Sequence, residues 1–239
     1  MARKIPQLIE QQVQFWSRKK NAEKGYHPPA KKLPIITVSR EFGAKGAALA
    51  TALGDEIQFK VWDKDLLSVI SDEIGRSEQF IKALDETRRG LLEDTIFGFM
   101  NLRETNLNYL ICLVKTVQAL EKKGNNIVVG RGANYICEND SSFHIRVVCP
   151  LKNRIQAYAK KEGLPNGVAG EIVMAKDEER KSFVQYNFKR NVDHPGDYDL
   201  ILNSNTYSIE QMVEMVIHAY ELKTGVKLPR NHARKKALA

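Results

Sequence analysis

The segment from Leu33 to Gly54 constrains the fold most, because it combines a short apolar run, a glycine-bearing turn and a run of small residues. Ile35 to Val38 is a β-branched stretch of the kind found in parallel strands buried on both faces. After the turn, Gly46, Ala47 and Ala48 bring small side chains to a predicted helix start. Backbone N–H groups and the helix dipole favour anions there. The segment therefore predicts a phosphate-binding loop in an α/β fold.

The loop departs from the standard motif G-x-x-x-x-G-K-[ST], in which the lysine reaches phosphates and the hydroxyl binds Mg²⁺. Lys45 is preceded by Ala44 instead of glycine, no Ser or Thr follows it, and Thr51 comes a turn too late. Arg40, directly after the strand, is a candidate replacement because a guanidinium can bind phosphate through two parallel hydrogen bonds. The alternative is that Arg40 forms a salt bridge with Glu41 or another acid at the strand end.

The net charge of +8 belongs to the two ends of the chain. Residues 1–32 and 223–239 each carry +6, whereas residues 33–222 carry −4. Such ends could contact RNA or an acidic partner, and solvated flanks explain them equally well. No run approaches the roughly 18 apolar residues of a membrane span. Because the chain start also lacks the apolar core of a secretory signal, we expect a cytoplasmic protein without membrane contact.

Apolar runs alternate with helical patterns along the rest of the chain. The predicted strands after the first are Ile57–Asp63, Ile127–Val129, Phe143–Val148 and Tyr198–Asn203. The predicted helices are Ile5–Lys20, Lys64–Ile74, stretches within 77–123, one from Leu151, Ala169–Val192 and Ile209–Leu222. This alternation predicts a mainly parallel sheet with helices on both faces.

Ligands of parallel sheets bind at the carboxyl ends of the strands. This rule brings four segments to one edge: Ser39–Gly46, Asp63, Gly130–Gly132 and Asn203–Asn205. An arginine between two glycines at a strand end, as at Arg131, favours a functional role over a structural one.

Several motifs occur in a recognisable order: S-R-E-F-G-x-x-G, V-W-D-K-D-L-L, V-V-G-R-G-A-N-Y-I, Arg154 on the helix after the next strand, and Y-D-L-I-L-N-S. Together they resemble the cytidylate-kinase-like family of P-loop nucleoside monophosphate kinases over residues 33–222. The resemblance implies the three-layer P-loop NTPase fold, with a five-stranded mainly parallel sheet. It also implies a helical monophosphate-binding insertion near 60–125 and a helical lid near 165–195. The implied reaction transfers the γ-phosphoryl of ATP to a CMP- or dCMP-like acceptor with Mg²⁺.

The resemblance also assigns roles to residues, with the catalytic ones expected to be Lys45, Arg40 and Arg180. The residues implied to bind the ATP phosphates are Ser39, Arg40, Gly43, Ala44, Lys45, Gly46 and Ala47. Those implied for the acceptor are Asp63, Lys64, Gly130 and Arg131. The lid candidates are Lys176, Arg180, Lys181 and Arg190, and the loop expected to border the adenine is Asn203, Ser204 and Asn205.

Two departures from the family pattern leave the function open. Neither register of the loop supplies a hydroxyl for Mg²⁺, so the metal ligands stay unassigned. The aspartate that reads cytosine in the family corresponds to Gly132 here.

The first hypothesis for the function is a kinase acting on a nucleoside monophosphate. The second is a nucleotide-binding pseudo-kinase or sensor without turnover, and the third is an RNA-associated factor that uses the basic ends. The apolar helical stripes within 77–123 are also compatible with a homodimer.

Overall fold

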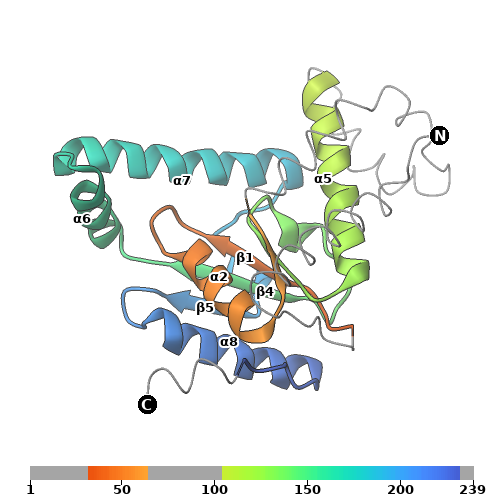
Figure 1. Cartoon of the computed structure of the whole chain (residues 1–239). Helices are drawn as coiled ribbons and strands as arrows, with labels where there is room; N and C mark the ends of the chain where they lie inside the picture. The colour runs from red at the N-terminus through yellow and green to blue at the C-terminus, as the bar shows by residue number, and fades with distance from the viewer. Residues whose placement is uncertain (1–31, 64–103, 232–239) are drawn as a thin grey trace, which may run out of the picture.

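Strand β1 (Ile36–Arg40) lies at the centre of a parallel sheet whose five strands are ordered β2-β3-β1-β4-β5. The other strands are β2 (Lys60–Trp62), β3 (Asn126–Val129), β4 (Phe143–Val148) and β5 (Leu200–Asn203). Figure 1 shows the sheet in a computed structural model, which describes residues 32–63 and 104–231. The predicted five-stranded α/β fold is confirmed. Because all strands run in the same direction, their carboxyl ends lie at one edge.

Both faces of the sheet are covered, which explains the continuous apolar runs in its strands. Helices α2 (Gly46–Ile57) and α8 (Ile209–Thr224) cover one face, where Ile36 and Val38 belong to a buried cluster that includes side chains of both helices. Helix α5 (Glu104–Lys123) covers the other face. There, Ile35 and Trp62 belong to a second cluster with α5.

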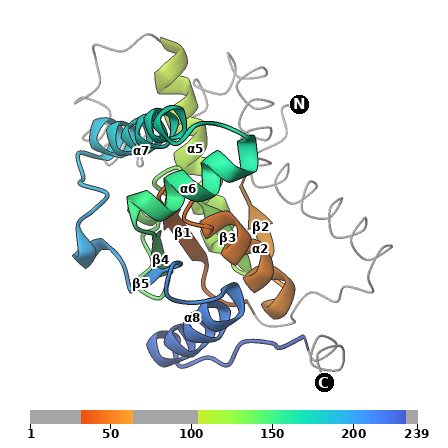
Figure 2. The ribbon, with the colours of Figure 1, turned by 90° about the vertical axis from the view of Figure 1, so that its left-hand side faces the viewer.

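Helices α6 (Leu151–Glu162) and α7 (Asn166–Phe188) follow β4. In the two views of Figures 1 and 2, α7 and α8 lie on opposite sides of the strands. Short 3₁₀ helices occupy Ala133–Tyr135 and Pro195–Asp197. The predicted lid region near 165–195 therefore contains one long helix, α7, and the start of the segment that connects α7 to β5.

The boundaries around β2 differ from the sequence-based prediction. Ile57 was predicted to begin a strand, but it ends α2, and Gln58 closes the helix in the left-handed region with φ 58°. The N–H of Phe59 then donates to the carbonyl of Gly54. Ile57 and Phe59 are both fully buried. Ile57, Phe59 and Val61 alternate with Gln58 and Lys60, and this period of two begins already at the end of α2, so the sequence pattern does not mark the boundary.

The folded unit continues past α8. Leu228 is buried against the cluster beneath α2 and α8, and the N–H of Asn231 donates to the carbonyl of Glu56. The predicted helices at 5–20 and 64–74, and most of the predicted insertion near 60–125, lie outside the described residues. Within residues 32–63 and 104–231, no helix combines the length and apolarity that crossing a bilayer requires.

Candidate functional site

A cavity of about 400 Å³ lies at the carboxyl edge of the sheet, between β1, the loop after β3, β4 and α7. Six basic and three acidic side chains are among the residues that line it. The predicted site residues found there are Ser39, Arg40, Gly130, Arg131, Lys176, Arg180 and Lys181. The excess of positive charge favours an anionic ligand.

Arg40 extends across the site in a channel made by two glycines. A Cβ added to Gly46 would lie 2.5 Å from the Arg40 Cβ, and one added to Gly130 would lie 1.7 Å from its Nη1. The guanidinium contacts the Asp63 carboxylate at 3.4 Å. The predicted alternative, a salt bridge to an acid at a strand end, is therefore present. Its partner is Asp63, and Glu41 is paired elsewhere.

Three guanidinium groups act on one another in this cavity. Burial, and then the positive charge of Arg180, lower the pKa of Arg40 to about 10, and Arg131 acts in the same direction. Burial is also the main cause that lowers the pKa of Arg180; the carboxylates of Asp177, Asp63 and Glu179 act in the opposite direction, and Arg131 adds a smaller lowering effect. Arg180 donates through Nη1 to the carbonyl of Arg40 at 3.2 Å. Like charges held this close are stabilised by an anion placed among them.

The predicted loop lysine lies apart from this cluster. Lys45 is exposed and forms the N-cap of α2 with φ 62°, and it is not among the residues that line the cavity. Gly46 is the first residue of α2 and is buried, whereas Ala47 is exposed. The helix start predicted from the small residues is confirmed. The cation facing the cavity from this part of the chain is Arg40.

The carboxylates of Glu41, Asp63 and Asp177 are each engaged by a base or a backbone N–H of the protein. Glu41 accepts the N–H of Cys149 at 2.8 Å, Asp63 contacts Arg40, and Asp177 pairs with Arg154. Thr51 donates its hydroxyl to the carbonyl of Ala47 on the helix. Among residues 32–63 and 104–231, no group of three or more His, Cys, Asp or Glu residues is placed to hold a metal ion.

Arg146 and Asp177 are among the residues of the site that were not singled out from the sequence as binding residues. Arg146, in the middle of β4, is 4% exposed, lines the cavity and donates to the Ser39 hydroxyl at 3.0 Å. It also pairs with Asp193. Asp177 of α7 accepts the N–H of Phe42 at 2.7 Å. An arginine within an otherwise apolar strand is the one signal that could have indicated Arg146, since such a side chain requires partners when buried.

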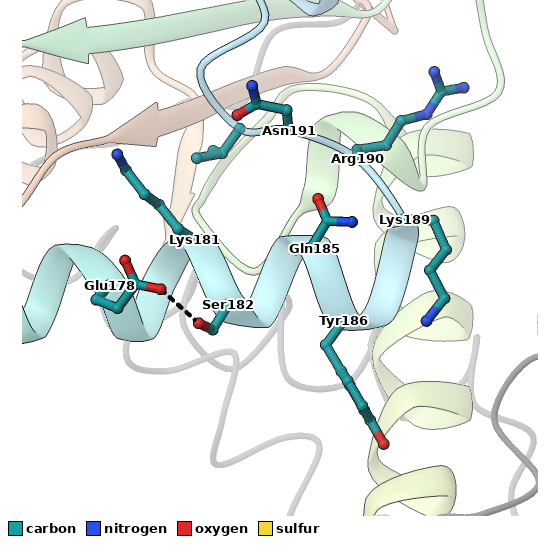
Figure 3. A pocket seen from close by; sticks show the side chains of 9 residues that line it. Glu178, Lys181, Ser182, Gln185, Tyr186, Lys189, Arg190 and Asn191 are labelled. Atoms are coloured by element: carbon teal, nitrogen blue, oxygen red, sulfur yellow. Dashed lines mark hydrogen bonds between the residues drawn. The ribbon is translucent and has the colours of Figure 1, made fainter.

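The remaining predicted residues lie elsewhere or outside the described part. Arg190 lines a second cavity of about 500 Å³ along the C-terminal half of α7, where it extends away from Lys181 (Figure 3). Asn203 ends β5, and Ser204 and Asn205 lie in the turn that follows, where the Asn203 side chain accepts the N–H of Asn205. None of the three lines either cavity. Lys64 lies outside the described residues.

The five-stranded parallel sheet, the helix that begins directly after its central strand and the arginine-lined cavity at the carboxyl edge define a parallel α/β protein with a basic cavity where such sheets bind ligands. Residues 35–206 match the model of the cytidylate kinase-like family. The chain belongs to this family.

The chain is also similar to individual proteins. The chain is 25% identical over 130 residues to a cytidylate kinase of Archaeoglobus fulgidus, covering 54% of this chain and 72% of that one. It is 28% identical over 98 residues to a uronate isomerase of Corynebacterium glutamicum, covering 41% of this chain and 19% of the isomerase. The match thus spans about a fifth of the isomerase. The solved structure of an uncharacterized protein from Eubacterium ventriosum aligns with a TM-score of 0.62 at 17% identity, covering 80% of this chain and 99% of that one.

Proposed function

We propose that this protein transfers the γ-phosphoryl group of ATP to a nucleoside monophosphate, with CMP or dCMP as the first acceptors to test. The observation that carries the proposal is the meeting of Arg40, Arg131 and Arg180 in one cavity at the carboxyl edge of the sheet. Phosphoryl transfer requires positioning and positive charge over the transferring group, and little covalent chemistry from the protein. Three adjacent guanidiniums meet that requirement.

The placement of these arginines suggests a division of roles. Arg131 follows β3, between Gly130 and Gly132, and is assigned to the acceptor phosphate. Arg180 comes from α7, in the region predicted to be the lid, lines the same cavity and is assigned to the group in transfer. Arg40 lies between them, beside the start of α2, and is assigned to the phosphates of ATP. The backbone N–H groups at the start of α2 would add a favourable dipole for the same phosphates.

The test is a coupled assay of ADP release with ATP, with and without Mg²⁺, over a panel of CMP, dCMP, UMP, AMP and GMP. We expect turnover with at least one pyrimidine monophosphate. Arg131→Ala is expected to reduce kcat/KM about 100-fold, as when a charged contact to the reacting group is lost. Lys152→Ala is a matched control, because Lys152 is an exposed base on α6 that does not line the cavity.

A second candidate, a nucleotide-binding module without turnover, is favoured by one specific observation. The loop lysine, Lys45, is exposed outside the cavity. This candidate predicts thermal stabilisation by ATP with no ADP release for any acceptor. That result would refute the kinase proposal, whereas turnover that depends on Arg131 would refute the binding module.

A further inference from the structure

Arg154 of α6 connects the loop after β1 to the rest of the site. Its side chain is only 5% exposed. Its Nε donates to the carbonyl of Cys149 at 2.7 Å and its Nη1 to the carbonyl of Phe42 at 3.0 Å. The same guanidinium lies 3.5 Å from the Glu41 carboxylate and pairs with Asp177 of α7. One buried cation therefore contacts the loop, the end of β4 and α7.

The loop is held from both helices at Phe42. Its N–H donates to the Asp177 carboxylate at 2.7 Å, so Asp177 contacts the loop backbone as well as Arg154. The Phe42 ring meets Tyr158 of α6 edge to face, with 5.3 Å between centroids. The Phe42 ring also makes a cation–π contact with Arg180, whose guanidinium lies 5.4 Å from the ring centroid. The loop, α6 and α7 thus form one connected unit.

The same unit pairs the carboxylates of Glu41 and Asp177 with Arg154. Glu41 and Asp177 both lie beside a cavity proposed to bind phosphates, where unpaired carboxylates would repel the ligand. Both are paired with Arg154, and Glu41 additionally accepts the N–H of Cys149. A buried charge pair that loses one partner leaves the other uncompensated. Removing Arg154 would therefore free two carboxylates at the site and loosen α7.

We propose that Arg154 is a positioning residue, which fixes α7 on the loop so that Arg180 is presented to the cavity, and which withdraws the charges of Glu41 and Asp177. The proposal rests on the proposed function for its kinetic consequence. Its structural consequence, the docking of α7, is independent of turnover. Arg154 does not line the cavity itself, so it would act through Arg180 and not on the substrate.

The first experiment is hydrogen exchange on the full chain. Arg154→Ala and Asp177→Asn are each expected to speed exchange of amides in α7 at least tenfold relative to those in β1 and β3. Asp177→Asn keeps an oxygen for the Phe42 N–H and removes the ion pair, so it serves if Arg154→Ala does not fold. Lys152→Ala is expected to leave exchange unchanged. Unchanged α7 exchange, or equal acceleration in α7 and the strands, would overturn the proposal.

The second experiment is a double-mutant cycle in kcat/KM between Arg154 and Arg180. If Arg154 presents Arg180 to the cavity, the loss in the double variant is expected to be clearly smaller than the product of the two single losses, and any loss beyond that of Arg180→Ala measures the two carboxylates that Arg154→Ala frees. Independent effects would multiply instead, and that result would overturn the positioning role. A wild-type protein that turns over no monophosphate would refute the proposed function, and the exchange experiment would still decide whether Arg154 docks α7.

Discussion

Replacing Gly130 with alanine tests whether the position of the Arg40 guanidinium matters. The added Cβ would lie 1.7 Å from the Arg40 Nη1 and 2.8 Å from its Cζ. Since carbon contacts settle at about 3.5–4.0 Å, the guanidinium must move by roughly 2 Å. It cannot withdraw along its stem, because the Arg40 Cβ and Cγ already pack against Gly46. A misplacement of about 1 Å can reduce a rate about 100-fold. We therefore expect kcat/KM to fall about 100-fold, or about 2.7 kcal/mol in transition-state stabilisation.

Gly163→Ala is a matched control for this change. Gly163 has φ +68° and Gly130 has φ +76°, so alanine is strained at both, at a cost of roughly 1–2 kcal/mol. No atom lies within 4 Å of a Cβ added to Gly163. Urea unfolding would measure the shared backbone cost, and ADP release the effect on activity. Equal kcat/KM in the two variants would refute the reasoning that Arg40 must occupy this position.

Three further predictions concern the folded framework. Trp62→Phe removes the indole N–H that donates to the buried Asn126 side-chain oxygen at 2.9 Å. We expect the free energy of unfolding, measured in urea, to fall by about 2 kcal/mol. An unchanged free energy would contradict a stabilising role for this hydrogen bond. Ser208→Ala removes the capping box of α8, with an expected loss of about 1 kcal/mol by the same measurement. Burial lowers the pKa of His144, so the unfolded chain binds this proton more readily and stability falls as the pH drops below about 6.5. His144→Gln is expected to flatten that decline in unfolding measured between pH 7 and 5, and an unchanged slope would show that other groups cause it.

The sequence predicted the fold well because apolar periodicity and glycine turns are local signals. Neighbouring residues alone were enough to predict three elements: the strand after Pro34, the small-residue helix from Gly46 and the buried run Ile127 to Val129. The prediction was wrong at Ile57, because the alternation of apolar and polar residues that leads into β2 begins already at the end of α2. Boundaries of this kind depend on a single left-handed residue, here Gln58.

The site was harder to predict because its contacts join residues far apart in the chain. Strand-end reasoning correctly brought Arg40, Arg131 and Asp63 to one edge. It did not predict which acid pairs with which base: Arg40 contacts Asp63, whereas Glu41 faces Arg154, more than one hundred positions away along the chain. Such pairings depend on side-chain direction and on how α6 and α7 return over the loop.

The sequence by itself determined that a strand, a glycine turn and a small-residue helix would follow one another at the carboxyl edge of a parallel α/β fold. Only the tertiary structure decided which cation faces that edge. Lys45 and Arg40 are close in sequence, but Lys45 takes a left-handed N-cap position and is exposed, whereas Arg40 lies along a channel between Gly46 and Gly130. That channel exists because a helix and a distant strand end both present glycine to the same side chain. No local pattern contains that information.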